Sequence, residues 1–122
     1  MALRERNYHH RYGCPVEATL DIISGKYKGV ILFYLLQGTM RFGELRRLLP
    51  YVTQRILTHQ LRELENDGIV KRTIYAEIPP KVEYSLTDSG RSLKPLLVLM
   101  RDWGDQYLEQ VQQTEGSEKN AA

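Results

Sequence analysis

This 122-residue sequence contains a single cysteine and no long uninterrupted run of apolar residues. One cysteine excludes a disulfide within the chain and favours a reducing compartment. No apolar segment approaches the roughly 20 residues that a transmembrane helix needs. Residues 1–13 also lack the apolar core of a signal peptide. We therefore expect one compact domain in the cytoplasm, with no membrane partner.

The sequence also lacks the motifs of the common enzyme classes. It contains no glycine-rich phosphate loop, no metal-ligand signature, and no nucleophile with a base and an orienting acid near it. A metal site built from His9, His10 and Cys14 is disfavoured, because adjacent histidines are poorly spaced for one ion. We predict that the protein is not an enzyme and has no metal and no cofactor.

The formal net charge is only +2, but the charges are unevenly distributed along the chain. Residues 1–75 hold 12 Lys and Arg against 7 Asp and Glu, a net charge of +5. Residues 76–122 hold 5 and 8, a net charge of −3. The basic excess therefore lies in the part of the chain that contains residues 53–67, and this distribution favours a nucleic-acid partner for that part.

Residues 53–67 (TQRILTHQLRELEND) have the pattern of one amphipathic helix. Leu57, Leu61 and Leu64 share one face, and Thr53 is a good N-cap because its hydroxyl can accept a hydrogen bond from a first-turn amide. The opposite face is rich in cations and hydrogen-bond donors, which suits the major groove of DNA. The alternative is an ordinary solvated surface helix. The residues predicted to contact bases are Gln54, Arg55, Thr58, His59 and Arg62.

The neighbouring segments predict a winged helix-turn-helix domain of the α+β class, mainly α. A short helix at 43–49, with Phe42, Leu45, Leu48 and Leu49 turned inward, and a turn at 50–52 precede the helix, and Gly68 is expected to cap its end. Residues 69–76 and 82–86 are β-branched and aromatic, which predicts a two-stranded wing. A plain structural hairpin is the alternative. The residues predicted to contact the DNA backbone are Lys26, Lys28, Arg41, Thr53, Lys71, Arg72 and Lys81.

Helices are also predicted on both sides of this unit. Pro15 opens a short helix, and residues 26–37 predict a buried central helix because they are apolar on nearly every side. A last helical region, capped by Thr87 and kinked at Pro95, should reach residue 113. Residues 1–12 are expected to form a flexible arm, residues 13–113 the domain and residues 114–122 a disordered tail.

The last helical region carries a long apolar stripe. A chain of this length already has a core around residues 26–37, so we expect part of the stripe to be buried against a second copy of the protein. The alternative is that the stripe packs entirely within one chain. Its residues in the predicted dimer interface are Leu97, Met100, Trp103, Gly104, Tyr107 and Val111.

A series of short blocks, taken in order, resembles a known family of proteins. The blocks are CPVEATL (14–20), GKYK (25–28), RFGELR (41–46), QRILT (54–58), LRELE (61–65), DGIV (67–70), and VEYSLT (82–87) with Gly90. They resemble HxlR-type bacterial transcriptional regulators over residues 12–108, with a departure at Tyr27, where the family commonly has Trp. The resemblance implies a homodimeric DNA-binding winged helix that pairs through its C-terminal helix and an N-terminal segment that includes Val16. A dimer of this kind would place its two recognition helices about 34 Å apart, so the operator should be an inverted repeat.

Cys14 has two interpretations. As a sensor of oxidants or electrophiles, its thiolate would be favoured by the helix N-terminus at Pro15 and by Arg11. Some proteins of the family sense through a cysteine at this place, and a disulfide between two copies of Cys14 would reorient the DNA-binding halves. The alternative is a structural role, in which Cys14 is a small apolar residue in the dimer interface. A non-covalent small-molecule effector, and a winged helix that binds only proteins, are the alternative functions.

Overall fold

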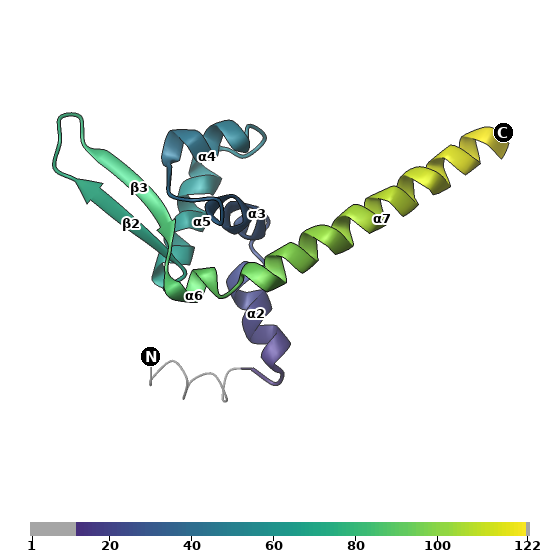
Figure 1. The fold of residues 1–122 in the computed structure, drawn as a ribbon, viewed down its shortest axis with the longest axis horizontal. Helices are drawn as coiled ribbons and strands as arrows, with labels where there is room; N and C mark the ends of the chain where they lie inside the picture. Colours follow the sequence, from purple (N-terminus) through teal and green to yellow (C-terminus); the bar gives the residue numbers. More distant parts are fainter. Residues whose placement is uncertain (1–11, 122) are drawn as a thin grey trace.

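In the computed structural model, which describes residues 12–121, a helical body carries two projections, the β2–β3 hairpin and the long helix α7 (Figure 1). The mainly helical α+β class predicted from the sequence is confirmed. The elements are α2 (Pro15–Ile23), α3 (Lys28–Leu35), β1 (Met40–Arg41), α4 (Phe42–Leu48), α5 (Gln54–Asn66), β2 (Val70–Tyr75), β3 (Lys81–Leu86), α6 (Asp88–Arg91) and α7 (Lys94–Ala121).

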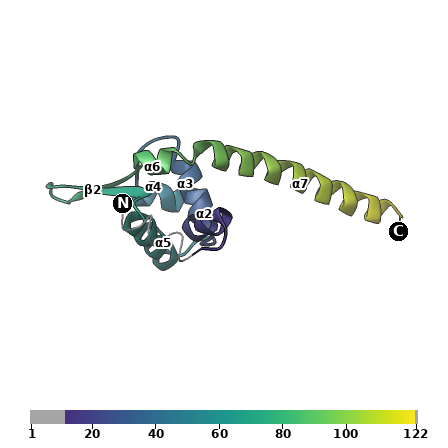
Figure 2. The ribbon, with the colours of Figure 1, turned by 90° about the horizontal axis from the view of Figure 1, so that it is seen from below.

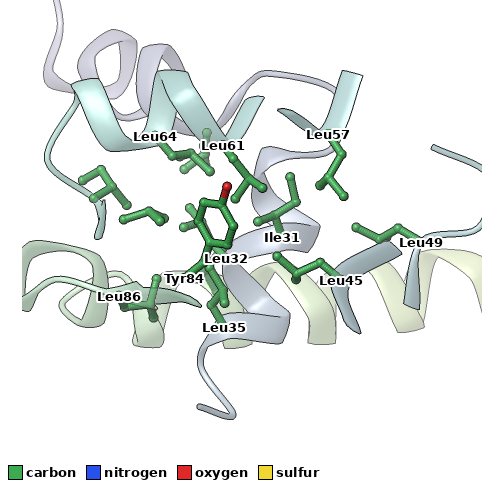
Figure 3. Close-up of a cluster of buried hydrophobic side chains, with 14 of the residues drawn as sticks. Ile31, Leu32, Leu35, Leu45, Leu49, Leu57, Leu61, Leu64, Tyr84 and Leu86 are labelled. Carbon is green, nitrogen blue, oxygen red and sulfur yellow. The ribbon is translucent and has the colours of Figure 1, made fainter. Parts of the chain in front are cut away.

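The hydrophobic core is built around α3, as Figure 3 shows. Helix α3 is buried on most sides because its sequence is apolar nearly throughout, as predicted. The leucine side of α5 packs against it, and so does the end of β3. Leu48 of α4 was expected to point inward but is 40% exposed, whereas Leu45 and Leu49 are fully buried. The core side chains labelled in Figure 3 are Ile31, Leu32, Leu35, Leu45, Leu49, Leu57, Leu61, Leu64, Tyr84 and Leu86.

The β2–β3 hairpin, residues 70–86, is called the wing. It belongs to a three-stranded antiparallel sheet in the order β1-β3-β2. Directly paired residues of neighbouring antiparallel strands lie on the same face of a sheet. Arg72 pairs with Tyr84, which is buried, so this pair lies on the core-facing side. Lys71 pairs with Ser85, one residue out of step, and therefore lies on the outer side.

One hydroxyl joins the end of α5 to the base of the wing. Gly68 ends α5 with a φ of 72°, so the predicted left-handed cap is confirmed. The Thr87 hydroxyl donates a hydrogen bond to the Gly68 carbonyl (2.7 Å) and accepts one from the Gly90 amide (3.1 Å), which caps α6. The predicted N-cap at Thr87 is thus also confirmed, and it fastens α5, β3 and α6 together.

The C-terminal helical region differs from the prediction in two ways. The chain breaks between α6 and α7 at residues 92–93, so Pro95 lies in the first turn of α7, where proline is tolerated, rather than kinking a continuous helix. Helix α7 then continues to Ala121, and the prediction of a disordered tail after residue 113 is wrong for residues 114–121. The predicted arm falls outside the described residues, apart from Tyr12. No helix within residues 12–121 has the length and apolar character to cross a lipid bilayer.

Candidate nucleic-acid interface

Helix α5 lies along one edge of the body, as Figure 2 shows. It begins at the predicted cap, where the Thr53 hydroxyl accepts a hydrogen bond from the Ile56 amide at 3.1 Å. Its leucines are buried, and the residues predicted to contact bases lie on the accessible side. Four of these are exposed and Thr58 is partly buried: Gln54, Arg55, His59, Arg62 and Thr58.

A groove runs along each side of α5. The groove toward the wing has a volume of about 390 Å³ and contains Thr58, Arg62 and Arg72. The groove toward the start of α3 has a volume of about 950 Å³ and contains Lys26, Arg55 and His59. Helix α5 is therefore a ridge between two hollows that both carry cationic side chains. This shape is suited to a helix that enters a groove of double-stranded DNA between its two phosphate backbones.

The structure separates the predicted backbone-contacting residues of the sheet. Arg72 lies on the face that borders the α5 groove. Lys71 and Lys81 lie on the opposite face, and so does Arg41, which pairs with Glu83 of β3. The Lys81 ammonium lies 3.0 Å from a Glu83 carboxylate oxygen and 5.0 Å from the centroid of the Tyr75 ring. Among these four cations, only Arg72 is grouped with the accessible side of α5.

Lys28 is buried, contrary to the prediction from the sequence. It is only 4% exposed, and its ammonium lies 3.4 Å from a carboxylate oxygen of Glu63 on α5. A buried ammonium needs an anionic partner, and this one already has it. The prediction that Lys28 contacts DNA phosphate is therefore wrong. Lys26, two residues earlier, is exposed at the rim of the larger groove.

Sequence reasoning missed two polar contacts that fix α5. The Arg46 guanidinium of α4 donates a hydrogen bond to the side-chain oxygen of Gln54 at 3.3 Å. Gln60 is 8% exposed, and its side-chain oxygen accepts a hydrogen bond from the Tyr27 amide at 3.0 Å. The first contact could have been predicted, because Arg46 lies in the last turn of α4 only eight residues before Gln54. The second had no local signal, because its partner is 33 residues away.

Cys14 is an exposed free thiol at the N-cap position of α2. Its side chain makes no capping hydrogen bond there, so its accessibility is consistent with either interpretation of this residue. Arg11, His9 and His10 lie outside the described residues. Within the described part of the chain, no group of three or more His, Cys, Asp or Glu side chains could hold a metal ion.

A second accessible surface is the apolar stripe of α7, together with α2. Trp103 is 68% exposed, and its ring stacks on that of Tyr107 with centroids 5.3 Å apart. Leu97 is only 3% exposed and belongs to the core, so its predicted place in a dimer interface is wrong. Gly104 and Val111 are partly buried. The exposed apolar residues of the two helices are Val16, Leu20, Leu99, Met100, Trp103, Tyr107 and Leu108.

Comparisons with known proteins agree with this architecture. The model of the HxlR-like helix-turn-helix family matches residues 22–112. The chain is 54% identical over 107 residues to the HTH-type transcriptional regulator YdeP of Bacillus subtilis, which is 88% of this chain and 84% of that protein. Among solved structures, it is similar to the redox regulator HypR in its reduced form (TM-score 0.77, 52% identity, 81% of this chain and 98% of that chain). It is also similar to diamide-treated YodB of B. subtilis (TM-score 0.65, 35% identity, 77% of this chain and 94% of that chain).

Proposed function

The chain belongs to the HxlR-like helix-turn-helix family of transcriptional regulators, and we propose that it binds an inverted-repeat DNA operator as a homodimer. One observation carries this proposal. The leucine side of α5 is buried in the core, while the side that bears Arg55, His59 and Arg62 is accessible and lies between two grooves. The winged helix-turn-helix fold presents its recognition helix in this way.

In the proposed complex, α5 enters the major groove, which is about 12 Å wide in B-DNA. Gln54, Arg55, Thr58 and His59 in its N-terminal half contact base edges, and Arg62 contacts a base or a phosphate. The two phosphate backbones that border the major groove lie in the hollows on each side of α5. Lys26 and Thr53 then approach one backbone, and Arg72 approaches the other. Arg41, Lys71 and Lys81 follow the backbone from the outer face of the sheet.

The proposed dimer is formed by the apolar stripe of α7 and by α2. Exposed apolar surface of this extent marks interaction sites in soluble proteins. In the proposed dimer, a twofold axis at this stripe relates two copies of α5, which enter successive major grooves about 34 Å apart. Val16, Met100, Trp103, Gly104, Tyr107 and Val111 are the residues we assign to this interface.

We further propose that the dimer responds to oxidants or electrophiles through Cys14. HypR has been solved in oxidised and reduced forms, and YodB after treatment with diamide. In this chain, an exposed thiol at the start of α2 lies beside the proposed interface. Diamide would oxidise Cys14 and Cys14 of the partner subunit to a disulfide, and the N=N bond of diamide would take up the two electrons and two protons. Operator affinity that is the same with and without diamide would refute this response.

A non-covalent effector is the second candidate for the signal. A groove of about 440 Å³ lies between α3 and α7 and is lined by apolar residues that include Val30, Phe33 and Met100. Its size is within the usual range for small-molecule sites. An effector bound there would change operator affinity equally in the wild type and in Cys14→Ser, whereas the diamide response requires the thiol.

The central experiment is selection of bound sites from random DNA, repeated with Cys14 oxidised and reduced. We expect a twofold-symmetric consensus whose half-sites are about 10 base pairs apart, centre to centre. Retention on heparin or random DNA that falls steeply with salt separates a DNA-binding protein from a winged helix that binds only proteins. Failure to enrich any sequence would overturn the proposed function.

A further inference from the structure

We infer that Glu63 is a positioning residue for base recognition: fixed by the buried Lys28, its carboxylate holds the imidazole of His59 in one orientation toward DNA. This inference rests on the proposed function, because it concerns how α5 distinguishes bases. It extends that function to a residue that does not itself touch DNA and that carries the wrong charge to do so.

Lys28 occupies a site that is shaped to hold its side chain. A Cβ atom added to Gly25 would lie 2.7 Å from Cδ of Lys28 and 2.8 Å from its Cε, which is closer than such atoms can approach. The glycine therefore leaves the space through which the lysine stem passes into the protein. The ammonium at the end of the stem then lies 3.4 Å from Oε1 of Glu63. Oε1 of Glu63 is thus held by a buried charge that needs an anionic partner.

This edge of α5 is also rigid. One turn before Glu63, the side chain of Gln60 accepts a hydrogen bond from the Tyr27 amide at 3.0 Å. Gln60 and Glu63 lie on the same side of α5, three residues apart, and both contact the start of α3. The helix cannot rotate about its axis without breaking both contacts. The position of the Glu63 carboxylate relative to the accessible side of α5 is therefore fixed.

The Glu63 carboxylate also contacts His59. Its Nε2 lies 3.0 Å from Oε1 of Glu63, one helical turn away, while the His59 side chain is 72% exposed. A carboxylate can only accept, so this contact is favourable only when Nε2 carries a proton. Nδ1 is then the nitrogen that remains for DNA, and in the neutral ring it is a hydrogen-bond acceptor. Glu63 thereby fixes which nitrogen faces DNA and, in the neutral ring, its character as an acceptor.

The test uses the operator obtained by selection, and each base-pair position of the operator is one base step. For each variant, the affinity for the preferred base is divided by the affinity for an altered base at every step. We expect His59→Ala to flatten the preference at one base step. Glu63→Gln should flatten the same step by about fivefold, the size of one ordinary hydrogen bond. The amide of glutamine can donate as well as accept, so either imidazole nitrogen can then face the base. The remaining steps keep their preferences.

Lys28→Met separates the buried ion pair from Glu63 itself. It removes the ammonium that fixes the Glu63 carboxylate but keeps the aliphatic stem beside Gly25 and keeps Glu63, so the preference at the His59 step should fall by less than in Glu63→Gln and the other steps should match the wild type. Glu65→Gln is the matched control, because it makes the same chemical change two residues away, on the side of α5 that borders the wing groove. It should leave the His59 step unchanged. The double variant Lys28→Met/Glu63→Gln leaves no unpaired buried charge, and it should show the flattened step even if Glu63→Gln alone folds poorly.

Two results would overturn the inference. If Glu63→Gln and the double variant keep the wild-type preferences while His59→Ala alters one step, Glu63 only fastens α5 to α3. If His59→Ala alters no step while Arg55→Ala does, His59 does not read a base. Both results leave the proposed function intact. Failure of the wild type to select any sequence would instead end the proposed function, and this inference with it.

Discussion

Cationic side chains around α5 differ in what their charges face. Lys28 and Lys81 each lie within ion-pair distance of a carboxylate, and Lys28 is buried as well. Arg55 and Arg72 are exposed, and no ion pair joins either of them to another described residue in the structure. A cation whose charge is not already neutralised loses less on binding phosphate or a base edge. Arg55 and Arg72 should therefore each contribute more to DNA binding than Lys28 or Lys81.

Arg55 is the residue at which sequence discrimination should be most sensitive to mutation. Arg55→Ala should weaken operator binding by about 1–3 kcal/mol, because a bidentate contact from arginine to guanine is lost. Binding to random DNA should change far less. Titration of both DNA types by fluorescence anisotropy, at one salt concentration, measures the difference. Equal losses on operator and random DNA would show that Arg55 does not read a base.

Arg72 and Lys81 test the division of the wing into two faces. Arg72→Ala should weaken binding to all sequences alike and lower the slope of log affinity against log salt by about one unit, since one phosphate contact is lost. Lys81→Ala should lower that slope by less, because Glu83 already neutralises part of its charge. Affinities measured over a series of salt concentrations give both slopes. A larger effect for Lys81 than for Arg72 would show that the outer face of the wing contributes more to phosphate contacts than the face that borders α5.

The sequence predicted individual residues well where the deciding neighbours are local. Thr53 and Thr87 were identified as caps because a hydroxyl followed by a helical pattern is a local signal. Lys28 was misassigned because a lysine at the start of a helix resembles a solvated cation, and its carboxylate partner is 35 residues away in the chain. Leu97 was misassigned for a related reason, since periodicity identifies an apolar side of a helix without saying what covers it.

At the level of elements, the boundaries of α5 and of the wing strands were predictable, and those of the C-terminal helices were not. Helix α5 has a cap, a leucine side and a terminal glycine, which together fix both ends. The last helical region has one apolar pattern that passes through the break at residues 92–93. The break follows α6, whose N-cap Thr87 is joined to the base of the wing by hydrogen bonds that span distant residues and that periodicity does not reveal.

Gly90 is the residue on which this junction should depend most. A Cβ atom there would lie 2.3 Å from the Ile69 carbonyl oxygen and 3.2 Å from Leu86 side-chain atoms. Gly90→Ala should therefore lower the free energy of unfolding by about 1–3 kcal/mol through overpacking. Gly116→Ala is the matched control, because a Cβ there meets nothing within 4 Å. Urea denaturation followed by circular dichroism compares them, and similar midpoints for the two variants would contradict the close packing at Gly90.

On the scale of the whole molecule, the proposed DNA-binding surface and the exposed apolar surface lie on different parts of the chain. Helix α5 and the wing form one side, and most of α7 projects from the other, as Figures 1 and 2 show. Near its N-terminal end, α7 packs against α3. Farther along α7, Trp103 and Tyr107 are exposed. This separation would allow two copies to associate without covering either copy of α5.

Trp103 provides the test of that association. Trp103→Glu places a charge in the apolar stripe, so it should dissociate the proposed dimer and weaken operator binding by at least about tenfold, because one half-site contact is lost. Gln113→Glu is the matched control, since it adds the same charge on the side of α7 that lies opposite Gly104 and Val111 of the stripe. Light scattering over a range of protein concentrations gives the mass of each variant. A wild-type protein that remains a monomer throughout, or a Trp103→Glu variant that remains a dimer, would exclude this interface.

Because α7 projects beyond the body, the exchange rate of its amide protons should depend on whether a second copy of the protein covers it. A helical segment that packs against nothing gains little beyond its backbone hydrogen bonds and frays readily in water. Its amide protons past Trp103 should then exchange with deuterium almost as fast as those of an unfolded peptide. Once the stripe is covered, the same amides should exchange at the slow rate of the core. Mass spectrometry of peptides from this segment would thus measure the fraction of chains in association without any label or mutation.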